Sequence, residues 1–250
     1  MSNHRALNMF GRSGNPAFGN KFSQQGSFVG TDAMSLSGTV NKTGILLGLC
    51  FFGALIGWNV PNMALIWIGL LGGFGAALYT IFVPRNAGIS SPIYAFLEGL
   101  ALGAISLFAE IQYPGIAIQA IGLTFGTLAS LLFFYKSGLI KPTENFRLMI
   151  VSATAGIALL YIVNIGMMVF GGGSGIGFIH SNGLIGIGFS LFVVAIAALN
   201  LVLDFDFIEQ GSENGLPKHM EWFGAFSLMV TLVWLYLEIL RLLAKLRSNN

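Results

Sequence analysis

Four carboxylates lie inside long apolar stretches of this sequence: Glu98, Asp204, Asp206 and Glu238. A carboxylate at the centre of a bilayer costs on the order of 2.5 to 3.5 kcal/mol on insertion scales, so acids in such places are candidates for a proton or ion pathway. Asp206 follows Asp204 by two residues, which turns it roughly 200° around a helix. We therefore expect Asp204 to face the protein interior and Asp206 to reach the headgroup region.

Each acid also has an ordinary structural explanation. Glu238 precedes Arg241 by three residues, the spacing of an ion pair on one helix face. Asp204 and Asp206 come near the end of their stretch, where headgroup water would solvate them, and Glu98 comes soon after the start of its own. The acids around the last loop are expected to be solvated, namely Glu209, Glu213 and Glu221. Position alone therefore leaves the role of these acids open.

The composition identifies the elements that must hold the acids. Only 9% of the 250 residues are charged and 55% are apolar or aromatic, whereas soluble chains carry about 25% charged residues. Most of the chain therefore contacts lipid, and the bilayer is its first expected partner. The net charge is +2 and the basic residues are scattered, so no nucleic-acid partner is expected. Cys50 is the single cysteine, which excludes an intrachain disulfide and a cysteine zinc cluster. No cofactor is expected.

Seven apolar runs are long enough to cross the hydrocarbon core, which takes roughly 20 helical residues. Bounded by charges, prolines and polar clusters, they cover residues 43–58, 62–83, 92–110, 115–135, 146–170, 184–208 and 221–243. The predicted fold class is an all-α membrane protein, a seven-transmembrane helix bundle over 43–247. Residues 1–42 are rich in Asn, Ser, Gly and Gln and show no apolar period, so they are predicted to form a disordered tail.

Glycines at small-xxx-small spacing predict close helix packing. Such pairs let helix backbones approach each other in lipid, where no hydrophobic effect drives helices together. Five pairs lie in the runs: Gly44 and Gly48, Gly53 and Gly57, Gly69 and Gly73, Gly99 and Gly103, and Gly122 and Gly126.

Small and polar residues share a helix face with the acid of the sixth run, and a partly polar set shares one with the acid of the last run. In the sixth run these are Ser190, Ala197 and Asn200 together with Asp204. In the last run they are Ser227, Thr231 and Trp234 together with Glu238. Each set recurs at helical spacing, so each predicts a partly polar stripe directed at a neighbouring helix.

The distribution of Lys and Arg predicts the orientation. Nine of them lie in the tail and in the loops after the second, fourth and sixth runs, while the three opposite loops have none. By the positive-inside rule the N-terminus is cytoplasmic. Arg241, Lys245 and Arg247 at the other end are exceptions. Either the cytoplasmic majority dominates, which we favour, or the last segment is partly re-entrant.

Several of these segments resemble a known family. The sequences SPIYAFLEGLALGAIS at 91–106, LDFDFIE at 203–209, EWFGAF at 221–226 and WLYLEILRLL at 234–243 resemble the Bax inhibitor-1/YccA-like membrane proteins, specifically a bacterial branch. The resemblance covers 43–247, and NPAF at 15–18 is similar to the tail of that branch. It implies a seven-helix fold whose last helix is central and wrapped by the other six, in a bacterial inner membrane.

The resemblance also implies a function. Better-studied relatives have a pH-sensitive calcium leak closed by two aspartates, on helices six and seven, that share a proton. Asp204 with Ile208 four residues later matches the first motif, and Glu238 stands where relatives have the second aspartate. The pair would bind Ca²⁺, a cation that prefers oxygen ligands, when ionised. Ca²⁺ and H⁺ are thus the implied permeants. A symmetric hairpin would not place the two acids level, so Glu98 remains an alternative partner of Asp204.

An enzyme is not expected. Gly172-Gly-Ser-Gly175 formally matches the nucleophile motif of rhomboid-type proteases, with His180 nearby. Serine catalysis needs a histidine base within hydrogen-bond reach, and in that family the base comes from another helix, whereas His4, His180 and His219 all lie in the tail or in loops. The same segment lacks the Lys-Ser/Thr of a phosphate loop. A flexible glycine-rich loop is the preferred interpretation.

The competing hypothesis is a non-transporting interaction protein. Members of the wider family are associated with stress tolerance and, in one bacterial branch, with modulation of a membrane protease, so other membrane proteins are possible partners. Solvent access to the acids separates the two hypotheses. A polar cavity that links Asp204, Glu238 or Glu98 to one face would favour the leak, while dry, salt-bridged acids would favour the scaffold.

Overall fold

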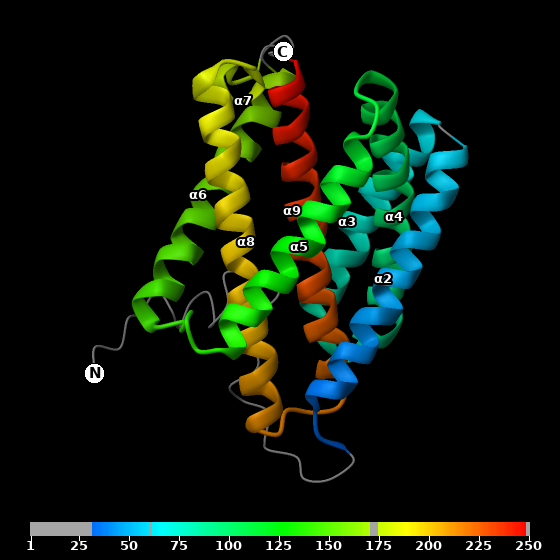
Figure 1. The fold of residues 1–250 in the computed structure, drawn as a ribbon. Coiled ribbons are helices and arrows are strands. Elements are labelled where there is room, and N and C mark those ends of the chain that lie inside the picture. Colours follow the sequence, from blue (N-terminus) through cyan, green and yellow to red (C-terminus); the bar gives the residue numbers. More distant parts are fainter. Residues whose placement is uncertain (1–31, 61, 171–174, 249–250) are drawn as a thin grey trace.

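The computed structural model describes residues 32–60, 62–170 and 175–248. Its seven long helices are α2 (Leu36–Asn59), α3 (Met63–Phe82), α4 (Ala87–Gln112), α5 (Ile116–Lys136), α6 (Glu144–Phe170), α8 (Leu184–Glu213) and α9 (Met220–Arg247). Two short elements join them, η3 (Pro84–Asn86) and α7 (Gly177–His180). All seven long helices are apolar enough to cross a membrane, so the predicted seven-helix fold class is confirmed (Figure 1).

Helix α9 is the central helix of the bundle (Figure 1). In its most apolar stretch 78% of the residues are buried, against 17% to 56% in the other six long helices. It packs against α2, α4, α5 and α8, while α3 packs on α4 and α6 on α8. The last helix is therefore central as expected, with α3 and α6 as the outer helices.

Glycines explain how closely α2 approaches α4. A Cβ on Gly99 would come within 2.1 Å of the Cys50 carbonyl oxygen, and one on Gly53 within 2.4 Å of the Phe96 carbonyl oxygen. Gly57 and Gly103 are as tight, and a Cβ on Gly69 or Gly73 of α3 would come within 2.6 or 2.7 Å of α4, whereas Gly44, Gly48, Gly122 and Gly126 have nothing within 4 Å. Three of the five predicted pairs therefore pack helices together and two do not.

Two helices begin earlier than the apolar runs predict. Helix α2 begins at Leu36 because the Ser35 side chain caps it by accepting from the backbone N–H of Gly38. Residues 36–42 are thus helical rather than part of a tail, and the rest of the predicted tail, 1–31, lies outside the described residues. Helix α4 begins at Ala87 and contains Pro92. Glu98 is therefore eleven residues past the helix start, near the middle of the span.

Glu221 ties the start of α2 to the start of α9. Its carboxylate is fully buried and accepts hydrogen bonds from the Ser35 backbone N–H at 2.9 Å, the Ser35 hydroxyl at 2.8 Å and the Lys42 ammonium. The expectation that Glu221 is solvated is therefore wrong, because polar groups at the start of α2 bind its carboxylate where water was expected to. Beside it, burial and the nearby Arg85 cation lower the pKa of His219, which favours the neutral imidazole at the start of α9.

The three cations near the end of α9 are all bound by the protein. Lys245 is buried and donates to the carbonyls of Ile179 at 2.7 Å and Gly186 at 3.0 Å and to the Ser190 hydroxyl at 2.9 Å. Arg247 donates to the Pro114 carbonyl at 2.6 Å and the Gln119 side-chain oxygen at 3.0 Å. Arg241 bonds to Glu238 and Tyr161.

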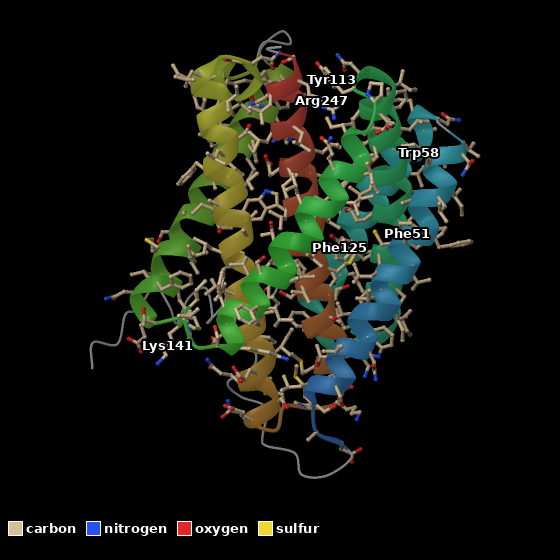
Figure 2. All side chains as sticks on the ribbon, viewed as in Figure 1. Phe51, Trp58, Tyr113, Phe125, Lys141 and Arg247 are labelled. Carbon is tan, nitrogen blue, oxygen red and sulfur yellow. The ribbon has the colours of Figure 1, made fainter. Side chains whose placement is uncertain are left out.

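Helix α9 is uninterrupted from Met220 to Arg247, so it does not turn back as a re-entrant segment. Figure 2 shows Arg247 beside Tyr113 at the end of the bundle opposite Lys141. Hydrogen bonds within the bundle thus account for the three basic residues at this end, which the charge distribution does not explain.

Candidate functional site

Asp204 joins α8 to the central helix. It is fully buried, and its two carboxyl oxygens accept hydrogen bonds from the hydroxyls of Ser227 at 2.8 Å and Thr231 at 2.6 Å on α9. Both hydroxyls belong to the polar stripe that the helical spacing predicts. Asp204 thus faces inward, and its α9 partners in this conformation are hydroxyls.

Glu238 is held near the other end of the same stripe. Its Oε1 accepts from the Tyr161 hydroxyl of α6 at 2.9 Å and from the Arg241 guanidinium at 2.9 Å. Arg241 also donates to the Tyr161 oxygen at 2.7 Å, which closes a three-residue network. The ion pair with Arg241 is the one that the three-residue spacing indicates.

The structure does not bring Asp204 and Glu238 into contact. Glu238 lies seven residues after Thr231 on α9, about 10 Å along the helix axis. Trp234 lies between them on the same stripe and is partly buried, packed against both apolar core clusters of the bundle. The two acids therefore form separate polar layers with an apolar layer between them.

Asp206 belongs to the opposite face of α8. It accepts from the Arg147 guanidinium at the start of α6 and from the Gln210 amide at 2.8 Å. Its exposure is only 7%, so the expectation that it reaches the headgroups is wrong. Arg147 takes the place of that water because α6 packs against α8.

Glu98 lies between α4 and α3. A Cβ on Gly73 would come within 2.7 Å of the Glu98 carboxylate, which fixes the acid against the α3 backbone. It is 9% exposed, and within the part of the chain that the structure describes no hydrogen-bond donor reaches it. Glu98 makes no hydrogen bond to Asp204, so neither proposed acid partner of Asp204 is bonded to it.

The partners of these acids were hard to find from sequence. In the sequence, Arg147 indicates only the orientation of a helix in the membrane. A comparison of its position across the membrane with that of Asp206 would have been needed to indicate an ion pair. Tyr161 carries no signal, because nothing in the spacing relates residues 77 positions apart to one another.

The described residues contain no group of three His, Cys, Asp or Glu side chains placed to hold a metal. The Asp204 oxygens face hydroxyls and Glu238 faces a cation, so this conformation does not assemble the hypothetical Ca²⁺ ligand pair.

The nucleophile motif at 172–175 lies mostly outside the described residues, since 171–174 are not described. His180 pairs with the Asn164 side chain, 3.2 Å from its Nδ2. Asn164 also accepts from the Ile176 backbone N–H at 2.7 Å. His180 thus helps to hold α7 against α6.

A seven-helix bundle around a central helix, with buried acids on its last two helices, defines a polytopic membrane protein of the kind that carries polar groups inside the bilayer. The family model for Bax inhibitor 1 like proteins matches residues 15–248, and the chain belongs to that family. A comparison with curated proteins found no match. The family is in general not one of enzymes.

Proposed function

We propose that this protein is a pH-sensitive cation leak, with Ca²⁺ as its expected cargo, and that the structure is its closed conformation. The observation that carries the proposal is Asp204, an acid with no exposed surface that is hydrogen-bonded to the central helix by two hydroxyls. Acids inside a membrane are costly and mark ion and proton pathways. Membership of the Bax inhibitor 1 like family supports the same function.

The proposed gate uses the proton on Asp204. A protonated Asp204 is neutral, so its burial between α8 and α9 is tolerated; its O–H then donates to one of the two hydroxyls, which can accept as well as donate. An ionised Asp204 would be a charge held at 0% exposure, and removing a charge from water costs far more than burying the neutral acid. Ionisation therefore draws water and cations toward the interface, and the leak opens as pH rises. Glu238 and Arg241 form the second polar layer of the path.

Trp234 is the proposed barrier between these layers. Apolar constrictions stop conduction by excluding water, and the partly buried Trp234 ring packs against both apolar clusters at the level between Thr231 and Glu238. Trp234→Ala is expected to raise Ca²⁺ flux into dye-loaded liposomes about tenfold, which corresponds to ~1.4 kcal/mol off the barrier. Flux is measured with a fluorescent calcium indicator.

The control is Trp67→Ala, which removes the same ring from the outer helix α3, where it is 58% exposed. Its flux should match wild type. Thermal unfolding of both variants in detergent establishes that they fold, since truncating a fully buried Trp costs about 3 to 5 kcal/mol and Trp234 is partly buried. Wild-type flux in a folded Trp234→Ala protein would remove Trp234 from the path.

The second candidate function is a non-transporting protein that binds and modulates other membrane proteins. The burial of Asp204, Asp206 and Glu238 and the salt bridges of Asp206 with Arg147 and of Glu238 with Arg241 favour it, because buried, paired acids need no ion pathway. Absence of flux at every pH would select this function.

The proposed location is a bacterial inner membrane with the N-terminus in the cytoplasm. Lys42, Arg85, Lys136, Lys141 and Lys218 lie at helix ends or loops on one side of the bundle. The cations on the other side are bound within the protein. Asp204 then lies nearer the cytoplasmic side and Glu238 nearer the opposite side.

A further inference from the structure

A lateral cleft of about 610 Å³ opens on the side of the bundle between α2 and α5. Its floor is formed by α4 and the central helix α9. The hydroxyls that line it are already bonded within the protein: Ser106 and Tyr236 to one another at 2.6 Å, and Thr124 to the Ala120 carbonyl at 2.8 Å. The other lining side chains are almost all apolar. An occupant of this cleft must therefore be apolar.

Glycine leaves the cleft open. Gly48 of α2 lines it, and a Cβ at that position would have nothing within 4 Å. Gly122 and Gly126 of α5 do not line the cleft but also have nothing within 4 Å. The tight glycines of α2, in contrast, face α4. Gly53 and Gly57 thus hold α2 against α4. On its cleft side, α2 has Gly48, which leaves space between α2 and α5.

The cleft continues the lipid-facing surface of the protein. Phe51 of α2 and Phe125 of α5 line it and are 61% and 46% exposed, and Figure 2 shows these two rings with Trp58 along the two helices. Lipid chains are the medium that covers such apolar surface in a membrane-spanning protein. Because protein interiors are close-packed and empty volume forfeits dispersion contacts, chains that cover the rim also fill the cleft.

The length of the cleft matches one leaflet. Along α2 it extends from Leu47 to Trp58, which are eleven helical rises or about 16 Å apart. Half of a hydrocarbon core is roughly 15 Å thick. Trp58 is next to the last residue of α2, so the cleft runs from the bilayer centre to the interface on the side of the α4–α5 loop.

We propose that this cleft is a binding site for one acyl chain of a phospholipid from that leaflet. The chain lies along Leu232, Val233 and Tyr236 of α9. Lipid therefore reaches the central helix, which the other helices otherwise enclose. The proposal does not depend on ion conduction.

Photo-crosslinking tests the site directly. Wild-type protein is placed in phosphatidylcholine vesicles doped with a phosphatidylcholine that carries a diazirine in its acyl chain, and labelled peptides are identified by mass spectrometry after irradiation. Label is expected on α9 between Met229 and Tyr236, because the bound chain contacts that segment. Label confined to outward residues such as Phe51 and Phe125 would overturn the proposal.

A matched pair of variants tests occupancy. Gly48→Leu adds a side chain inside the cleft where nothing blocks it, and should reduce α9 labelling several-fold. Gly75→Leu makes the same change on α3, also with nothing within 4 Å and away from the cleft, and should leave labelling unchanged. Equal α9 labelling in both variants contradicts the site. Crosslinks between two protein copies through α2 or α5, with α9 unlabelled, would show that a second copy fills the cleft and would also refute the proposal.

Discussion

Asp204→Asn is expected to lower Ca²⁺ flux through the reconstituted protein by about tenfold at alkaline pH, or ~1.4 kcal/mol, and to remove its pH dependence. The amide has the shape of the protonated acid and cannot ionise. It can still bond to the Ser227 and Thr231 hydroxyls, so the contact between α8 and α9 stays closed and dry. Flux is measured in liposomes loaded with a calcium indicator over a range of pH.

Asp206→Asn is the control for this prediction. It changes the neighbouring aspartate on the same helix, but on the face that pairs with Arg147. Its flux should keep the wild-type pH dependence. If Asp204→Asn keeps that dependence as well, the proposed gate is wrong. If only Asp206→Asn loses it, the gate lies between α6 and α8.

Gly103→Ala is expected to have the largest effect on stability. A Cβ there would lie 2.0 Å from the Ala54 carbonyl oxygen, so α2 and α4 must move apart. Overpacking costs typically 1 to 3 kcal/mol and occasionally more, and a backbone atom cannot rotate away. We expect a loss near or above ~3 kcal/mol, although Ala favours a helix over Gly by about 1 kcal/mol. Unfolding in detergent by heat or denaturant measures it.

Gly44→Ala separates this packing effect from helix propensity. Gly44 also lies in a membrane-spanning helix, but a Cβ at that position would have nothing within 4 Å. The same change there should leave stability unchanged or raise it by up to about 1 kcal/mol. Equal stability of the two variants would show that the α2–α4 contact is not as tight as described.

The sequence predicts the number and nature of the spanning helices well, because each run is long, apolar and bounded by polar residues. The helix starts are less certain. Helix α2 begins at Leu36 because of the Ser35 cap, and α4 at Ala87, ahead of Pro92. Both starts lie in polar sequence that the apolar pattern does not cover. The earlier start of α4 moves Glu98 from the edge of its span to the middle.

Side-chain pairing is predictable only within one helix. Spacing indicates the Glu238 pair with Arg241 and the inward direction of Asp204. The burial of Glu221 depends on Ser35 and Lys42, which precede it by 186 and 179 positions. The Tyr161 contact with Glu238 likewise joins two helices far apart in sequence. Such pairs follow from how helices pack, which one sequence does not reveal.

The most direct test of the proposed function is Ca²⁺ flux through the wild-type protein in liposomes, recorded from acidic to alkaline pH against protein-free liposomes. The proposed gate predicts a flux that is low at acidic pH, where Asp204 is protonated, and rises as pH increases. Flux equal to that of empty liposomes at every pH, or flux that does not change with pH, would contradict it.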